Sequence, residues 1–216
     1  MASTSAENIL EQLNWRYAVK AFDATKKLSD KDWQTLSESL RLTPSSYGLQ
    51  PFKFIVVKNA ELKKKLRAVS YNQSQIEDCS HLVVLTTLKK VSEKHVKDYI
   101  RLIAETRAMP VEPLAGLEQM MMGSLVANGQ GDKMQPWTQR QAYIAMGFLL
   151  ETAALIGVDA CPIEGIEPMK YDEVLGLNSS EFATVAVVAL GYRSATDIYQ
   201  KMKKVRQPTS TLIEIR

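Results

Sequence analysis

The sequence predicts a single α+β domain over residues 1–216, and two observations lead to that class. First, runs at residues 52–57, 81–88 and 182–192 are apolar and rich in β-branched residues, which is typical of strands. Second, these strands are few, and helical segments of irregular length separate them. No repeat or linker-like stretch divides the chain, which is long enough to bury a core.

Capping patterns and apolar spacing predict the helices. Thr4 with Glu7 forms a capping-box pattern ahead of a first helix, and Ser29 with Asp32 begins a second one. Residues 142–156 are apolar nearly all round, so their helix is expected at the centre of the protein or at a subunit interface. Further helices are predicted at 61–67, 72–79, 92–107 and 135–157, a short extended piece at 158–166, and a terminal strand at 209–216.

Residues 110–136 differ in character from the rest of the chain. They contain three successive methionines, Met120 to Met122, and a loose glycine-bearing loop at 128–133. Adjacent residues on a helix face different ways, so core packing must account for some of these methionines. The region of about 90–135 is expected to form a helical excursion that covers something, as a lid over an active site does.

Composition and charge exclude several classes of protein. Two distant cysteines without a CxxC motif argue against a zinc site and a disulfide framework, and they fit a reducing cytoplasm. We see no secretory signal, and the apolar run at 142–156 is too short to span a membrane. The net charge of +3 and the absence of a recognisable binding module argue against a nucleic-acid partner.

Most catalytic signatures are missing as well. The sequence has no P-loop, no GxGxxG fingerprint and no GxSxG elbow. His81 and His95 have no companions at ligand spacing, so neither a metal centre nor a catalytic triad is predicted. If the protein is an enzyme, a cofactor is expected to supply the difficult chemistry.

Three polar groups lie where one structural element gives way to the next. Arg16 and Lys20 are four residues apart and would project from one side of a helical turn. Lys204 and Arg206 are two apart and would face one way on an extended segment, and the turn at 44–48 ("PSSYG") offers hydroxyls and backbone N–H groups. Together these groups could hold a phosphorylated cofactor, although each basic pair would be equally at home on a wet surface.

Four motifs in register carry a resemblance to a known family. The segments "RYAVKAFD", "PSSYGLQPFKFIVV", "ACPIEGI" and "KKVRQP" resemble the FMN-dependent nitroreductases, and most closely the oxygen-insensitive NAD(P)H nitroreductases and flavin reductases. The resemblance extends from about Asn8 to Pro208 and is weakest at 90–135. It implies a nitroreductase-like fold with a central, mostly antiparallel sheet flanked by helices. It also implies an intertwined homodimer, a C-terminal segment that reaches the partner, and FMN in two interfacial clefts.

The resemblance assigns roles around FMN. Arg16, Lys204 and Arg206 would neutralise the phosphate. Lys20 and Asn72 would lie at the pyrimidine edge, where a cation stabilises the negative charge of reduced flavin. Ser45 and Ser46 would come from the partner subunit to close the pocket, and Gln141 would lie near the ribityl chain. The backbone of four consecutive residues would run along the isoalloxazine, namely Pro162, Ile163, Glu164 and Gly165. The N–H groups of Glu164 and Gly165 would lie near N5 and O4.

Three expected cofactor neighbours depart from the family pattern, and they join Tyr17 in the predicted binding set. Ala18 occurs where relatives often have serine, and Gly48 replaces a familiar polar residue. Gln75 stands where lysine is frequent, which predicts a somewhat lower reduction potential because the reduced flavin loses one stabilising cation. The neighbouring Tyr47 would either stack over a substrate or pack in the protein.

The resemblance implies an oxidoreductase that works in two steps. NAD(P)H would reduce FMN by hydride transfer to N5 and leave, and a small-molecule acceptor such as a nitroaromatic or quinone would then take the electrons. No side chain is assigned a catalytic role, and the choice between NADH and NADPH is left open. The alternatives are a reductase for one quinone, enone or pterin, a flavin-binding protein without turnover, and a helical structural protein.

Overall fold

The computed structural model describes residues 5–128 and 134–216. Its centre is an antiparallel sheet of four strands in the order β1-β2-β4-β3. The strands are β1 (Phe52–Val57), β2 (His81–Leu88), β3 (Asp159–Ile163) and β4 (Phe182–Gly191). They confirm all the internal strand predictions, including the short extended piece. The predicted α+β class with a mostly antiparallel sheet is therefore correct.

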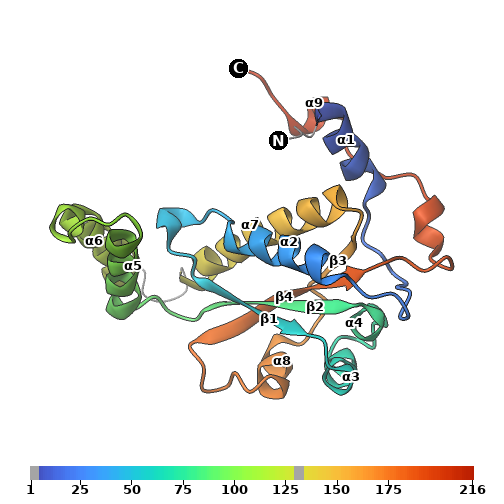
Figure 1. The fold of residues 1–216 in the computed structure, drawn as a ribbon, viewed down its shortest axis with the longest axis horizontal. Coiled ribbons are helices and arrows are strands. Elements are labelled where there is room, and N and C mark those ends of the chain that lie inside the picture. The colour runs from blue at the N-terminus through green and yellow to red at the C-terminus, as the bar shows by residue number, and fades with distance from the viewer. Residues whose placement is uncertain (1–4, 129–133) are drawn as a thin grey trace.

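Helical elements make up most of the remaining structure (Figure 1). The α-helices are α1 (Ala6–Trp15), α2 (Asp30–Arg41), α3 (Ala60–Ala68), α4 (Gln75–Asp78), α5 (Glu93–Thr106), α6 (Ala115–Met121), α7 (Met134–Leu155), α8 (Pro168–Val174) and α9 (Thr209–Leu212). Shorter turns are η1 (Ser46–Gly48), η2 (Glu112–Leu114) and η4 (Ile198–Lys201), and η3 (Met122–Ala127) is π-helical.

The predicted start of α2 is confirmed, whereas the cap of α1 lies one residue later than predicted. Ser29 caps α2, and its side chain accepts the Asp32 N–H. Ser5 caps α1 by accepting the Asn8 N–H, whereas the predicted Thr4 lies outside the described residues.

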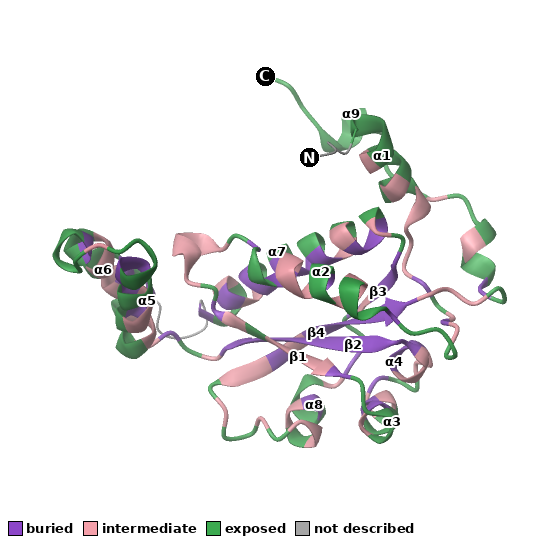
Figure 2. Ribbon diagram, viewed as in Figure 1, coloured by how far each residue is buried: buried purple, intermediate pink, exposed green. Residues whose placement is uncertain are grey.

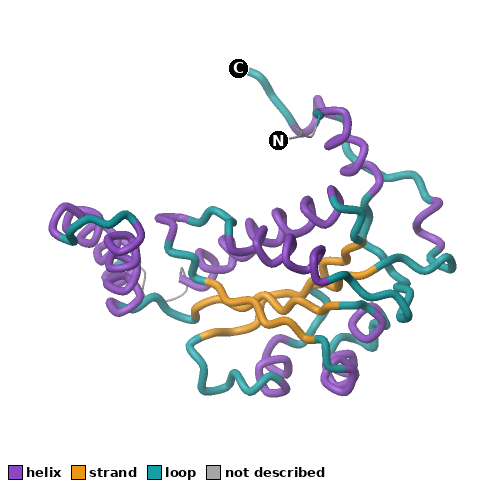
Figure 3. The backbone as a smooth tube through the Cα atoms, viewed as in Figure 1, coloured by secondary structure: helices purple, strands orange, loops and turns teal. Residues whose placement is uncertain are grey.

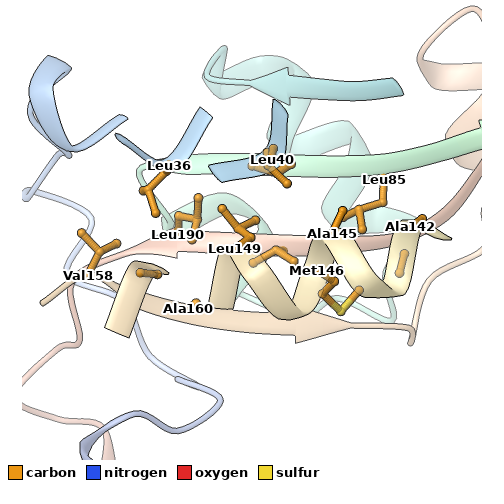
Figure 4. Close-up of a cluster of buried hydrophobic side chains, with 14 of the residues drawn as sticks. Leu36, Leu40, Leu85, Ala142, Ala145, Met146, Leu149, Val158, Ala160 and Leu190 are labelled. Atoms are coloured by element: carbon orange, nitrogen blue, oxygen red, sulfur yellow. The ribbon is translucent and has the colours of Figure 1, made fainter. Parts of the chain in front are cut away.

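Both faces of the sheet are covered, which explains why β2 is buried along its whole length. Side chains alternate between faces, so Val83 and Leu85 pack under α2 and α7 while Leu82 and Val84 pack toward α3 and α8. Figure 4 shows the first of these layers. Coverage of both faces explains why Leu82 to Leu85 are apolar at every position and do not alternate with polar residues.

The nearly all-apolar helix α7 is central, as predicted. Its buried side, which includes Leu149, lies on the sheet and against α2 (Figure 4). Its other side exposes Ile144 and Phe148 to solvent. Two different environments thus account for the two apolar sides of this helix.

The predicted excursion is helical and extends beyond one end of the sheet (Figure 1). Elements α5 to η3 bury their own cluster, in which Val96 and Ile100 of α5 pack with Leu125. Met121 is fully buried there while Met120 is largely exposed, which confirms that only some of the methionines serve the core. Figure 2 shows that the excursion as a whole carries both buried and exposed residues. Most of the predicted glycine loop, residues 129–133, falls outside the described residues.

The predicted terminal strand is wrong. Residues 209–212 form the single helical turn α9, and residues 213–216 form a tail that pairs with no strand of the described chain (Figure 3). A strand needs a neighbour to receive its backbone hydrogen bonds, and the tail lies away from both sheet edges (Figure 1). Within the described ranges, no helix has an apolar stretch long enough to cross a bilayer.

Candidate functional site

Cationic side chains converge on a pocket between the segment after α1 and the segment after η4. The pocket has a volume of about 500 Å³ and is lined by residues 14–18, 20, 199, 200 and 202–206. Arg16, Lys20, Lys204 and Arg206 all line it, so the two basic pairs meet in space. The first pair was predicted on a helical turn, which is wrong because α1 ends at Trp15. Alternation along an extended segment nonetheless directs residues 16 and 20 to the same side.

A buried carboxylate that sequence analysis did not select holds in place residues 16–20, the segment after α1 that we call the linker. Asp197 Oδ2 accepts the N–H groups of Lys20 at 2.7 Å and Ala21 at 3.1 Å. Burial acts to raise the pKa of this carboxyl, but the backbone donors outweigh burial and hold the pKa below its ordinary value. A sequence clue existed, because Asp197 is the one acid between Arg193 and Arg206.

Aromatic side chains hold the other flank of the linker. The Arg193 guanidinium lies 4.2 Å from the Trp15 ring centre and 4.6 Å from that of Tyr17. Arg193 also donates to the buried Asp159 carboxylate, with Nη2 at 2.6 Å from Oδ1. Ala18 forms a bridge with Ala160 of β3, which ties the linker to the sheet. The backbone around Arg16 is therefore well supported.

The basic side chains of this pocket have no acidic partner among the described residues. Within the part of the chain that the structure describes, Arg16, Lys20, Lys204 and Arg206 form no ion pair. Lys204 Nζ instead donates to the Leu13 and Arg16 carbonyls, at 2.5 Å each.

The pKa shifts in the pocket report the same excess of charge. Burial and the nearby Arg206 lower the pKa of Arg16. Burial lowers the pKa of Lys204 too, followed by the charges of Arg16 and Arg206. Clustered cations that disfavour one another fit an anionic ligand such as a phosphate group.

A second set of predicted residues gathers where β3 ends. Pro162 and Ile163 belong to β3, and Glu164 and Gly165 follow it. Gln73 Nε2 donates to the Gly165 carbonyl at 2.7 Å. Among the described residues, the N–H groups of Glu164 and Gly165 have no acceptor. Two backbone donors therefore remain available at an exposed loop.

The loop before α4 carries the other predicted residues of this set. Tyr71 and Asn72 both have left-handed backbone conformations, with φ of 50° and 57°. Asn72 Oδ1 accepts from Arg67 Nε at 2.9 Å, and Gln75 is buried at the start of α4. Lys20 Nζ lies 3.9 Å from Cys161 Sγ of β3 and so links this set to the basic pocket.

The remaining predicted residues lie at the opposite end of the molecule. Ser45 precedes η1, and Ser46 N–H donates to Gln141 Oε1 on α7 at 2.8 Å. Ser45 Oγ accepts the Gln50 N–H, also at 2.8 Å. In Figure 1 this turn lies near the start of α7, whereas α1 lies beyond the other end of that helix. One chain therefore does not bring the serines to the basic pocket.

The structure also shows what Tyr47 and Gly48 do in this chain. Tyr47 packs against the excursion, and its hydroxyl lies 3.0 Å from Ser124 Oγ. Gly48 has a φ of 75°, and a Cβ atom there would lie 2.2 Å from the Tyr99 hydroxyl oxygen. The approach of α5 explains why a residue without a side chain occupies this position.

Neither histidine belongs to these clusters. His81 stacks on Trp33, and its Nδ1 lies 2.9 Å from Ser80 Oγ. Burial, with the charges of nearby lysines, lowers the pKa of His81 to about 4. His95 joins Ser92 to Glu181. In the ranges described, no group of three or more His, Cys, Asp or Glu side chains is arranged to hold a metal ion.

Fold and site together define an α+β protein with an uncompensated basic pocket beside its sheet. The chain belongs to the nitroreductase family, whose model matches residues 13–192. It is 33% identical over 219 residues to a Staphylococcus haemolyticus protein whose name gives NAD(P)H nitroreductase as its inferred activity. That alignment covers 98% of this chain and 99% of the relative.

Solved structures show the same fold. YdfN of Bacillus subtilis, a nitroreductase by inference, superposes with a TM-score of 0.86 at 17% identity over 98% of this chain and 100% of that one. A crystal structure from Exiguobacterium sibiricum, of a protein also inferred to be a nitroreductase, contains FMN. It superposes with a TM-score of 0.79 at 20% identity over 100% of this chain and 99% of that one. The predicted nitroreductase-like fold is thus confirmed.

Proposed function

We propose that the protein is an FMN-dependent NAD(P)H oxidoreductase that alternates between reduction of the cofactor and reduction of a small-molecule acceptor. The uncompensated cluster of Arg16, Lys204 and Arg206 is the observation that carries the proposal. A dianionic phosphate would relieve the mutual repulsion of these side chains. The relatives named for NAD(P)H-dependent activity and the FMN complex of a structural neighbour support the same assignment.

In this proposal the chain's residues bind and orient the cofactor. Lys20 would lie at the pyrimidine edge, and Asn72 of the adjoining loop and Gln75 at the start of α4 would lie near the same edge. The free N–H groups of Glu164 and Gly165 would donate to N5 and O4. When bound, FMN supplies the redox chemistry, taking a hydride from NAD(P)H and delivering electrons to a nitroaromatic, quinone or similar acceptor.

We further propose that the site is completed in an intertwined homodimer. Three sets of apolar side chains lie exposed on the described chain: Leu10 and Leu13 on α1, Ile144 and Phe148 on α7, and Ile213 and Ile215 in the tail. A second copy that covers them would bury surface of the kind that stabilises obligate dimers. The C-terminal tail would then reach the partner and find the neighbour that it lacks in one chain.

Such a dimer would also explain the distant serine turn. Ser45, Ser46, Gly48 and Gln141 would reach the basic pocket of the partner subunit. The helical excursion packs against this turn through Tyr47, so it would stand beside the composite site as a lid. Each complete site would require both subunits. The whole chain would then act as one FMN-binding domain.

Anaerobic spectroscopy tests the function directly. Purified protein should bind FMN, and NADH or NADPH should bleach the flavin absorbance near its visible maximum. Adding a quinone or a nitroarene without oxygen should restore the colour, because the reduced protein then passes on its electrons. Bound flavin that neither nicotinamide reduces would contradict the oxidoreductase and favour a flavin carrier. If one acceptor restores the colour and the others do not, the result would favour a reductase specific for one substrate.

A further inference from the structure

Side chains from two separate regions hold the exposed loop after β3. Tyr143 of α7 donates its hydroxyl hydrogen to Glu164 Oε1 at 2.5 Å. Gln73 holds the next residue through the Gly165 carbonyl, and the Ile166 N–H closes a tight turn onto the Glu164 carbonyl at 2.8 Å. The direction of the Glu164–Gly165 peptide is therefore set by contacts on both sides.

The Glu164 carboxylate is exposed, and Tyr143 is the side chain that contacts it. Over residues 5–128 and 134–216, Glu164 forms no ion pair, and the Tyr143 hydroxyl is its one side-chain donor. Burial raises the pKa of Tyr143 to about 12, with a further contribution from Glu164. The phenol therefore stays protonated at neutral pH and remains a donor.

We propose that Tyr143 is a positioning residue for the bound cofactor, acting through Glu164. Its hydrogen bond holds the carboxylate and shields part of its negative charge, and it keeps the adjoining N–H groups aimed at the flavin. This inference rests on the proposed function. The consequence is that Tyr143 helps to set how strongly the protein prefers reduced over oxidised FMN.

The sign of the effect follows from elementary electrostatics. Reduced flavin carries negative charge at neutral pH, so an unshielded carboxylate nearby disfavours the reduced form. Tyr143→Phe removes only the hydroxyl and leaves Glu164 ionised and free to move. Glu164→Gln keeps an acceptor for Tyr143 but removes the charge. The two substitutions should therefore change the preference in opposite directions.

The experiment measures the reduction potential of bound FMN in dimeric, FMN-loaded protein. Combined with the potential of free FMN, it gives the ratio of the dissociation constants for oxidised and reduced cofactor. Tyr143→Phe should lower this ratio by about three- to tenfold, the range expected for one typical hydrogen bond between two exposed side chains. Glu164→Gln should raise it. Tyr192→Phe is the matched control, because its hydroxyl also meets a carboxylate, that of Asp32, but far from the loop.

Each outcome has a definite meaning. Opposite shifts for Tyr143→Phe and Glu164→Gln, with no shift for Tyr192→Phe, support the inference. Shifts in the same direction, or none for Tyr143→Phe, overturn it, because a merely structural contact would not produce opposite signs. Wild-type protein that binds no FMN overturns the proposed function and this inference together. Wild-type binding with unchanged ratios in all variants overturns the inference alone.

Discussion

The turn at residues 45–50 and the basic pocket lie at opposite ends of α7, and they are built on opposite principles. In the turn, polar groups find partners within the chain, as Ser45 does with Gln50 and Ser46 with Gln141. In the pocket, the backbone is equally well held by Asp197. Across the residues that the structure describes, however, the cationic heads of Arg16 and Arg206 have no counter-charge.

The difference separates what stabilises the fold from what prepares it for a ligand. A satisfied turn with a left-handed glycine contributes conformational stability. An uncompensated cluster of cations contributes little or negative stability until an anion arrives. Substitutions in the turn should therefore change the free energy of unfolding, whereas substitutions in the pocket should change binding and leave the fold intact.

The largest effect is expected for Gly48→Ala. The new methyl group would meet the Tyr99 hydroxyl, and the left-handed backbone would be strained as well. We expect a loss of about 3 kcal/mol in the free energy of unfolding, measured by urea denaturation of the FMN-free protein. Gly116→Ala on α6 is the control, since nothing lies within 4 Å of its Cβ position. Equal losses in both variants would show that the contact with Tyr99 is unimportant.

A second variant, Arg206→Gln, should weaken FMN binding without lowering the free energy of unfolding. Removing one of several cations that face the proposed phosphate should weaken FMN binding about tenfold or more, as seen by fluorescence quenching, because a charge-assisted bond is lost. The stability of the FMN-free protein should stay the same or rise slightly. Arg101→Gln, an exposed arginine on α5, provides the comparison. If Arg206→Gln destabilises the FMN-free protein as strongly as it weakens binding, the distinction between the two regions fails.

The smallest effect is expected for Tyr47→Phe. This change removes the hydroxyl that meets Ser124 but keeps the ring in its apolar cluster. The partly exposed bond should contribute about 0.5 kcal/mol. Faster amide hydrogen exchange should appear in residues 115–127 and not in the sheet. Unchanged exchange there would mean that packing alone holds the excursion to the turn.

Elements with strong local patterns could be predicted from the sequence. Strand β2 has four consecutive apolar residues, Leu82 to Leu85, because both faces of the sheet are covered. Ser29 with Asp32, three residues further on, specifies the start of α2. Periodicity alone could not predict that Arg16 and Arg206 line the same pocket, because the two residues are 190 positions apart in the sequence. The motif order that resembles a family supplied that information.

Predictions failed where the outcome depends on distant partners. The tail at 209–216 has the composition of a strand but no edge to pair with in one chain. The linker at 16–20 is extended because Asp197 and Ala160 bind its backbone, and no local pattern reports such contacts.

The sequence by itself determined the class of fold, the positions of the internal strands and main helices, and the basic side chains that line the pocket. Periodicity and capping act over a few residues, so they can be read directly from the chain. Only the tertiary structure decided which residues support the site: Asp197 beneath the linker, Gln73 and Tyr143 around the loop after β3, and Tyr99 against Gly48. These contacts join residues far apart in the chain, and their geometry exists only once the sheet and its helices have packed.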